Sequence, residues 1–347
     1  MAAIAMMLVL SGCDYSFTQR QSVFDTKGPV AEMQLDVMWR TFYVTGFLFL
    51  TVGGALVYTI IRYRKRATDS PDFRPKQSHG NPLIEVGLIA ASALMLVTIA
   101  VPTVRGIVDM NEVPEEYLNG KEPLEVTVIG YQWWWMFEYP EEGIETSNEL
   151  VIPINRPVKL KLHSADVNHS FWLPKLAGKK DLIPGQENTM WIMGEEAGKY
   201  WGQCAEFCGE SHARMLFRAF VKPEQEYRAW VEKQKSPPEE PDTELQAMGQ
   251  KLFTQKGCVS CHRVGQNGGA IGPNLTHFGS RSSLAAGWRD NNRKNLIEWI
   301  RYPERVKPGN LMYEGVANMA GIKQIRKEKG LSRKETEALA TYLLNLN

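Results

Sequence analysis

The chain has 347 residues, which is long enough for two or three domains. Its 40 basic and 39 acidic residues leave a net charge of +1, so the composition excludes the strongly basic balance typical of a nucleic-acid-binding protein. The five cysteines, Cys13, Cys204, Cys208, Cys258 and Cys261, fall in three separate short motifs. This distribution argues against a disulfide framework.

The first 13 residues are apolar and end in Leu-Ser-Gly-Cys13. This ending resembles a bacterial lipobox, in which cleavage precedes the cysteine and a lipid is attached to it. The segment has no basic residue before its apolar run, unlike a full signal peptide. We interpret residues 1–13 as a lipoprotein signal segment; a short buried helix is the alternative.

Residues 14–110 contain two apolar runs, at about 41–61 and 83–104, each long enough to span a bilayer. The loop between them carries six Lys/Arg and two Asp. The positive-inside rule therefore predicts a transmembrane hairpin with a cytoplasmic loop and both ends outside. Glu85 lies near the inner end of the second span, where it could serve a proton pathway or be solvated among lipid headgroups.

Residues 111–232 have alternating, β-branched segments separated by Pro, Gly and Asn turns, which predict a β-sandwich or barrel. The expected strands are 124–129, 158–162, 190–193 and 215–221. His169 is expected to follow one strand, and residues 204–215 to connect the last two. Residues 233–243 are rich in Pro and charge and are interpreted as a linker that reaches roughly 30 Å if it is extended.

Residues 244–347 are predicted to form a compact helical domain, with helices at 244–256 and 295–301. A capping box, Ser332-Arg-Lys-Glu335, opens a last helix. The fold class is thus a two-helix transmembrane hairpin, an all-β domain and an all-α domain.

The helical domain carries Cys258-Val-Ser-Cys261-His262, the attachment pattern of covalent haem c. The two thiols bind the haem vinyl groups, and His262 becomes the proximal iron ligand. A zinc half-site or a redox dithiol would need partner cysteines that this domain lacks. Met312, after a Pro-Gly turn, is the expected sixth ligand, with Met319 as the alternative. His277 is expected to be an exposed loop residue rather than a contact of the haem edge.

A second set of soft ligands lies in the segment Cys204-Ala-Glu-Phe-Cys208-Gly-Glu-Ser-His212-Ala-Arg-Met215, with His169 upstream. Thiolate, imidazole and thioether ligands favour copper. A Cys204–Cys208 disulfide, a Cys2His2 zinc site and a single blue-copper ion remain alternatives. Two thiolates could instead bridge two copper ions, each completed by one imidazole.

This segment resembles the dinuclear copper A loop of cytochrome c oxidase subunit 2. Asp166-Val-Asn-His169-Ser-Phe-Trp-Leu-Pro174 resembles the family's histidine strand, and Gly130-Tyr-Gln-Trp-Trp-Trp135 its aromatic segment. The hairpin before a cupredoxin domain is the family's layout, and the fused cytochrome c domain is similar to that of caa(3)-type oxidases. The resemblance covers nearly the whole chain; Tyr131 departs from it, where the family usually has histidine.

The resemblance implies a role for each matching residue. The copper ligands would be His169, Cys204, Cys208, His212, Met215 and the carbonyl of Glu206. The Glu206 side chain would reach a magnesium ion shared with subunit 1. Trp133 would receive electrons from cytochrome c, and Glu85 would lie at the mouth of a proton channel into subunit 1.

We therefore expect an electron-input subunit of a proton-translocating oxidase in a bacterial cell membrane, with its copper A and cytochrome c domains on the outer side. Its partners would be subunit 1, where dioxygen is reduced, and an external donor such as a cytochrome c or a quinol-oxidising complex. Two alternatives remain. One is the equivalent subunit of a copper A nitric oxide reductase, and the other is a membrane-anchored electron carrier or copper-delivery protein.

Overall fold

The computed structural model describes residues 18–66, 69–70, 74, 79–118, 120–310, 312 and 331–347. Cys13 and the predicted signal segment lie outside these residues. The chain divides into two compact units, one formed by residues 32–110 and the other by the remainder. Each unit is described by itself.

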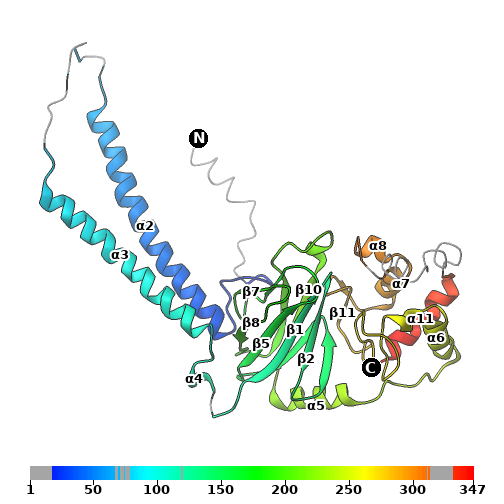
Figure 1. Ribbon diagram of the computed structural model, residues 1–347. Helices are drawn as coiled ribbons and strands as arrows, with labels where there is room; N and C mark the ends of the chain where they lie inside the picture. Colours follow the sequence, from blue (N-terminus) through cyan, green and yellow to red (C-terminus); the bar gives the residue numbers. More distant parts are fainter. Residues whose placement is uncertain are drawn as a thin grey trace. The chain divides into compact units, whose positions relative to one another are not determined.

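The first unit consists of two long apolar helices, α2 (Pro29–Tyr63) and α3 (Pro82–Asp109), drawn in blue and cyan in Figure 1. Both helices are longer than the predicted spans. The most apolar stretch of each helix contains no residue that is buried against the rest of the chain. Asn81 caps α3 by accepting a hydrogen bond from the backbone N–H of Leu83 at 3.0 Å, and Pro82 occupies the first turn. Helices of this length and exposed apolar surface fit a membrane anchor.

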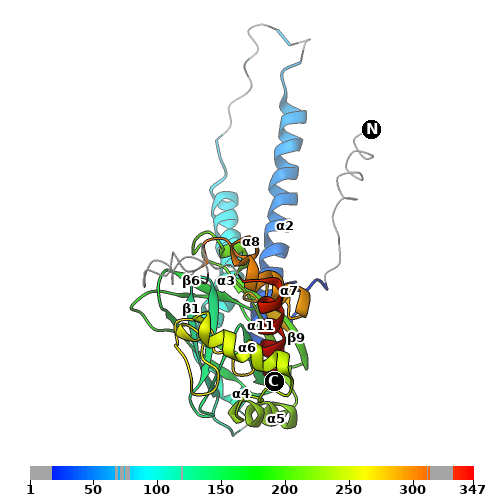
Figure 2. The ribbon, with the colours of Figure 1, turned by 90° about the vertical axis from the view of Figure 1, so that its right-hand side faces the viewer.

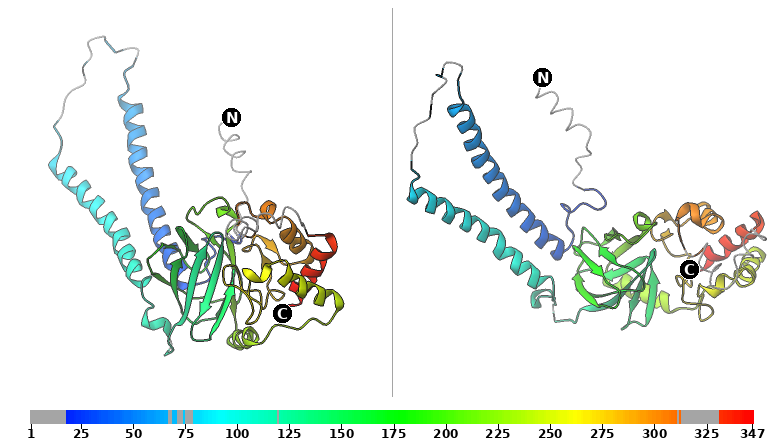
Figure 3. Two further views of the ribbon diagram at one scale, coloured as in Figure 1. Left: turned by 45° about the vertical axis from the view of Figure 1, so that its right-hand side comes forward. Right: turned by 45° about the horizontal axis from the view of Figure 1, so that its top comes forward.

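The predicted β-domain is a sandwich of two five-stranded sheets, visible as the green arrows in Figure 3. The first sheet has the order β3-β2-β1-β5-β8 and the second β4-β10-β9-β6-β7. Only the neighbours β1/β5 and β4/β10 pair in parallel among these strands. The strands are β1 (Leu124–Tyr131), β2 (Trp134–Tyr139), β3 (Ile144–Ser147), β4 (Glu149–Pro153), β5 (Val158–Ser164), β6 (His169–Trp172), β7 (Lys179–Leu182), β8 (Asn188–Ile192), β9 (Gly198–Cys204) and β10 (Leu216–Lys222).

The sandwich core is built from side chains that alternate inward along these strands. In β2, Trp135 and Phe137 are fully buried, while the alternate residues Trp134, Met136 and Glu138 are partly exposed. Phe171 of β6 stacks on Phe217 of β10 at 4.6 Å between ring centroids, and Trp135 meets Phe171 edge-on at 5.9 Å. Each such buried ring stabilises the fold by roughly 2–3 kcal/mol. This aromatic cluster lies beside His169, whose ring is 6.0 Å from that of Trp135.

Short helical elements flank the sandwich. They are α4 (Glu115–Leu118), the 3-10 turn η1 (His212–Arg214) and α5 (Glu224–Lys235). Helix α5 continues three residues into the predicted linker, so residues 233–235 are helical rather than extended. The ion pair of Lys235 with Glu142 of the sandwich, at 3.7 Å, contributes to this continuation.

The helical C-terminal domain is organised around α6 (Glu244–Gln255) and α11 (Arg333–Asn345), which pack together in Figure 2. A Cβ at Gly249 would lie 2.1 Å from the carbonyl of Ala338, so only glycine permits this close helix crossing. Both helices open with complete capping boxes, Thr243/Gln246 and Ser332/Glu335, which confirms the predicted start of the last helix. The domain also contains η2 (Cys258–Ser260), β11 (Ser283–Leu284), β12 (Arg289–Asp290), α7 (Arg293–Arg301) and α8 (Pro303–Val306).

Candidate metal centre and haem-attachment site

The loop between β9 and β10 brings the predicted soft ligands to one place at the end of the second sheet. Cys204 ends β9, His169 begins the neighbouring strand β6, and the two strands pair directly. Cys204 and Cys208 are buried at 4% and 3% exposure, and Met215 is fully buried. The strand pairing therefore positions two ligands, and the loop supplies the others.

The ligand atoms of this cluster converge within a few ångströms. The Cys204 and Cys208 sulfurs lie 3.8 Å apart, and the Nδ1 of His169 lies 3.9 Å from the Cys204 sulfur. On the other side, the Cys208 sulfur lies 3.6 Å from the Nδ1 of His212 and 3.7 Å from the Met215 sulfur. The carbonyl oxygen of Glu206 lies 3.2 Å from the Cys204 sulfur. These six groups fit a site in which two sulfurs lie between two sets of terminal ligands.

A disulfide, a single-copper site and a Cys2His2 zinc site were the alternatives for this loop, and each can be compared with the observed positions of the donor atoms. The sulfur separation of 3.8 Å is far above the roughly 2.05 Å of a disulfide, so Cys204 and Cys208 are thiols in this structure. A single-cysteine copper site would leave one buried thiol without a role. A Cys2His2 zinc site would leave the buried Met215 sulfur without a role. Only a two-metal site uses all the donors that converge here.

The two thiols differ in acidity. A hydrogen bond from Cys208 lowers the pKa of the Cys204 thiol to about 4, against the effect of burial. The resulting thiolate and burial then raise the pKa of Cys208. One thiolate is therefore ready for a metal, and a cation between the sulfurs would favour ionisation of the second.

Asp166 is a residue of this site that sequence reasoning did not single out. Its Oδ1 lies 2.8 Å from the Nε2 of His169, and its Oδ2 accepts the backbone N–H of Gln132 at 2.6 Å. Burial opposes ionisation of Asp166, but its hydrogen bonds, led by that of His169, lower its pKa overall. The carboxylate therefore holds Nε2 as the protonated nitrogen and directs Nδ1 toward the sulfurs. Its position three residues before a ligand histidine was the available signal.

Trp133 is in direct contact with the ligand loop. Its indole N–H donates to the carbonyl of Cys208 at 2.9 Å, and the side chain of Gln132 donates to the same oxygen at 2.7 Å. Trp133 is only 7% exposed. The predicted electron-receiving tryptophan is thus connected to Cys208, a predicted copper ligand, by one hydrogen bond.

The haem-attachment motif lies at the C-terminal end of α6. Cys258 and Cys261 are partly exposed in the turn η2, and the backbone N–H of His262 donates to the carbonyl of Cys258 at 3.0 Å. The Nδ1 of His262 lies 2.8 Å from the carbonyl of Pro273, which makes Nε2 the lone-pair nitrogen of the neutral ring. Burial lowers the pKa of His262, which favours that neutral form. This geometry fits an iron ligand.

The remaining residues singled out from the sequence lie outside the soft-ligand cluster and the haem-attachment motif. Met312 is partly exposed and follows the Pro308-Gly309 turn, whereas the alternative ligand Met319 lies outside the described residues. The prediction for His277 was wrong. Its ring is buried between the carbonyls of Gln234 and Asn347, at 3.2 and 3.0 Å, because it joins α5 to the end of the chain. Glu85 lies in the first turn of α3, in the other unit.

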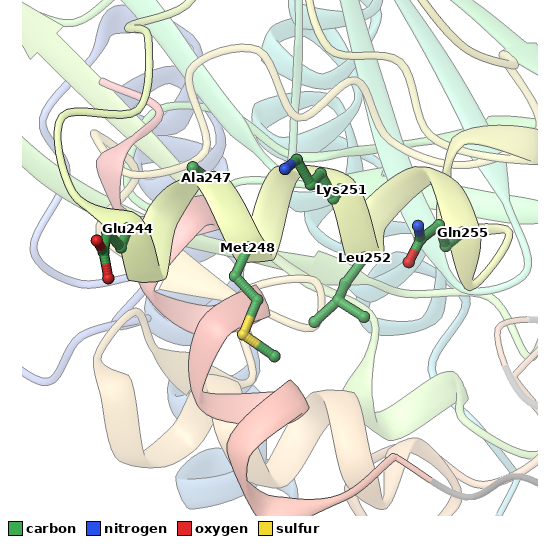
Figure 4. Close-up of a pocket in the computed structure, with 6 residues that line it drawn as sticks. All are labelled: Glu244, Ala247, Met248, Lys251, Leu252 and Gln255. Carbon is green, nitrogen blue, oxygen red and sulfur yellow. The ribbon is translucent and has the colours of Figure 1, made fainter.

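A shallow cavity of about 390 Å³ lies along α6. Figure 4 shows Met248 and Leu252 on one side of the helix and Lys251 on another. None of its six lining residues is a predicted ligand. Leu252 belongs to the core of the helical domain and Met248 packs against that core, so we assign the cavity no role in the chemistry.

The fold and site define a redox protein with a soft-metal centre on a β-sandwich and a cytochrome c domain beside it. Comparison with known families agrees: residues 142–219 match the model "Cytochrome C oxidase subunit II, periplasmic domain", and residues 246–347 match "Cytochrome c". The chain belongs to the cytochrome c oxidase subunit 2 family and is a subunit of an oxidase. The two matching models imply copper A and haem c as its cofactors.

Curated relatives cover nearly the whole chain. Cytochrome c oxidase subunit 2 of Alkalihalophilus pseudofirmus is 36% identical, over 98% of this chain and 94% of the relative, and that of Bacillus subtilis is 32% identical over the same shares. Quinol oxidase subunit 2 of Bacillus spizizenii is 37% identical over 67% of this chain and 71% of the relative. Among solved structures, the periplasmic domain of oxidase subunit II from Bradyrhizobium japonicum is 34% identical over 33% of this chain and 95% of that domain, with a TM-score of 0.32.

Proposed function

We propose that this chain is the electron-input subunit of a respiratory haem-copper oxidase. It receives electrons at a covalent haem c in residues 244–347 and transfers them to a dinuclear copper A centre in the sandwich. From there they pass to a partner subunit in which dioxygen is reduced. The convergence of two thiols, two imidazoles, a thioether and a backbone carbonyl, on a chain that also carries a haem-attachment motif, is the observation that carries this proposal.

The copper assignment follows from the donor set. Cys204 and Cys208 would hold the copper ions through their thiolates, and His169 and His212 through their imidazoles. The Met215 sulfur and the Glu206 carbonyl would provide the remaining, weaker ligands. A bound copper pair supplies a carrier for one electron at a time. The strand pairing of β6 with β9 and the Asp166–His169 hydrogen bond hold the donors in place, so that little geometry needs to change when the charge changes.

The haem assignment follows from the attachment motif. Cys258 and Cys261 would form the two thioether bonds, His262 would bind the iron through Nε2, and Met312 would be the second iron ligand from this chain. The hydrogen bond to Pro273 supports the role of His262, because it fixes the tautomer and the orientation of the ring. The haem supplies the first of the two one-electron carriers on this chain.

The hairpin extends the proposal to the membrane. Helices α2 and α3 would anchor the chain in a bacterial cell membrane, with the copper and haem domains on the outer side and Cys13 lipidated. Glu85 would serve a proton pathway into the partner subunit of a proton-translocating oxidase. The Glu206 side chain would reach a magnesium ion shared with that subunit, and Trp133 would receive the electrons.

The test is to purify the intact complex and measure its metals, spectra and gas consumption. We expect two copper ions at the Cys204–Met215 loop, in addition to any copper held by the partner subunit. We also expect one covalent haem per copy of this chain, a mixed-valence copper signal and uptake of dioxygen. One copper ion, or zinc, at the Cys204–Met215 loop would refute the dinuclear assignment. Consumption of nitric oxide without dioxygen would instead place the chain in a nitric oxide reductase.

A further inference from the structure

The loop that follows α8 in the haem domain, residues 307–310, lies directly against Trp133. Lys307 is only 3% exposed, and its ammonium donates to the backbone carbonyl of Trp133. Gly309 has a φ of +70°, and a Cβ there would lie 3.0 Å from the indole Cη2 of Trp133 and 2.7 Å from a carboxylate oxygen of Glu210. The close approach and the backbone conformation both require glycine at this position.

The copper-ligand loop contributes contacts on its own side. Ser211 is 1% exposed, and its hydroxyl donates to the carbonyl of Pro308 at 2.6 Å. Arg214 donates to the carbonyl of Val306 at 2.9 Å. Both residues flank the proposed ligand His212. The haem domain therefore meets the sandwich at the segment that holds one end of the copper site.

A second group of contacts joins the same two domains away from Trp133. Glu149 is 8% exposed, and its carboxylate accepts the backbone N–H of Ser282 at 2.9 Å and the hydroxyls of Ser282 and Ser283 at 2.7 and 2.9 Å. Arg218 is 7% exposed and donates to the carbonyl of Gly287 at 2.6 Å. Each of these buried charges thus has its hydrogen-bond partner on the other domain.

These contacts are unlike those expected of a short-lived encounter. Transient electron-transfer interfaces are small, and contacts at an interface rim stay solvated. Here Lys307, Glu149 and Arg218 are withdrawn from water, which is costly unless each keeps its partner. Burial also lowers the pKa of Lys307 to about 7. A covalent linker gives an effective concentration on the order of 1 mM, so even an interface with a Kd of about 1 μM would be undocked only about 0.1% of the time.

We propose that residues 307–310 dock the chain's own haem domain on Trp133, so that this tryptophan serves the fused haem and is covered against a separate donor protein. The inference rests on the proposed function and adds the contact through which it operates. In the transfer, one electron leaves the haem iron, which is oxidised by one unit, and the copper pair is reduced by one. No bond forms or breaks, and no proton moves. An external donor would then bind to the haem domain.

The test compares two loop variants in the intact, metal-loaded complex. Lys307→Met removes the hydrogen bond to Trp133 without adding volume, and Gly309→Val places a side chain against the indole. After photoreduction of haem c, we expect both to slow electron transfer to copper at least tenfold. We also expect both to increase deuterium uptake in residues 306–310 and 130–136. Lys294→Met, at an exposed lysine of α7 in the same domain, is the control and should change neither quantity.

The outcomes separate the inference from the proposed function. If both variants keep full haem and copper content and match the unaltered complex in transfer rate and deuterium uptake, the docking contact is wrong while the relay stands. If the unaltered complex shows no transfer from haem c to copper, the proposed function itself fails. Should Gly309→Val assemble without haem, Lys307→Met still decides, because it adds no bulk to the interface.

Discussion

The two proposed redox sites of this chain are positioned in different ways. The copper donors lie on paired strands and one short loop, all within the described residues, and six donor groups already converge there. The haem ligands come from a turn after α6 and from Met312 on a separate loop. Main-chain hydrogen bonding between β6 and β9 places two of the proposed copper donors, His169 and Cys204, and the following loop supplies the rest. The haem is itself a large apolar group, so its pocket is completed by the cofactor as well as by the chain.

Removing a copper ligand should have the largest effect. Cys204→Ser deletes the sulfur that lies beside His169, the Glu206 carbonyl and the Cys208 sulfur. We expect loss of the copper pair with retention of covalent haem. Since changes outside the ligand shell already cost about 10–100-fold in metal affinity, the loss here should exceed 100-fold. Copper analysis and the mixed-valence signal measure it. Two copper ions bound with unchanged affinity would contradict the assignment.

Removing the haem-attachment cysteines tests whether the copper site forms independently of the haem. Cys258→Ala with Cys261→Ala should abolish covalent haem, detected as haem that migrates with the chain under denaturing conditions. The copper signal of the same protein should persist, because the sandwich positions its donors without help from η2. Loss of both cofactors together would show that the two sites are not independently positioned.

The carboxylate behind the copper site should have an intermediate effect. Asp166→Asn removes the charge that holds the Nε2 proton of His169, and we expect copper affinity to fall about 10–100-fold. Competition with a chelator of known affinity measures the change. Glu187→Gln is a matched control in the same domain, because Glu187 pairs with the partly exposed His163 instead. If Asp166→Asn and Glu187→Gln bind copper with equal affinity, Asp166 does not support the copper site.

The smallest effect concerns the stability of the haem domain in acid. The Lys256 ion pair at 2.8 Å, with hydrogen bonds from Ser332, lowers the pKa of Glu335 to about 2 from 4.5. A carboxyl with a depressed folded pKa contributes stability above its unfolded value, and this contribution is lost as pH falls from about 4.5 to 2. Glu335→Gln should therefore lower the denaturant midpoint at pH 6 but change it little at pH 2.

Haem absorbance in the intact protein would monitor this unfolding. Glu298→Gln, on α7 of the same domain, is the control and should not show the same loss between pH 4.5 and pH 2. A Glu335→Gln deficit that is as large at pH 2 as at pH 6 would contradict the ionic origin of the effect.

Local sequence pattern predicted much of this fold because each element has a local cause. Alternation predicted the strands now seen as β1, β5, β8 and β10, and the capping box at Ser332 predicted the start of α11. Residues 204–215 were predicted to connect the last two strands, and they lead from the end of β9 to the start of β10. These features are determined by residues close together in the chain, so their pattern can be recognised in the sequence.

The features that were missed in the sequence depend on contacts between segments that are far apart in the chain. His277 was expected to be exposed, yet carbonyls of Gln234 and Asn347 bury it. Lys307 was not singled out from the sequence, yet its ammonium donates a hydrogen bond to the carbonyl of Trp133, far away in the chain. Asp166 stood in the quoted motif, but its bonds to both His169 and Gln132 appear only when β1 and β6 are folded together. Tertiary packing decides such positions.

The proposed function depends above all on electron transfer from the haem of this chain to its copper pair. Photoreduction of haem c in the intact complex, with haem and copper absorbance followed together, measures this step. We expect haem reoxidation and copper reduction to proceed with one shared rate constant, and Cys204→Ser to abolish this phase. If haem c is reoxidised equally fast in the unaltered complex and in Cys204→Ser, its electrons do not pass to the copper pair.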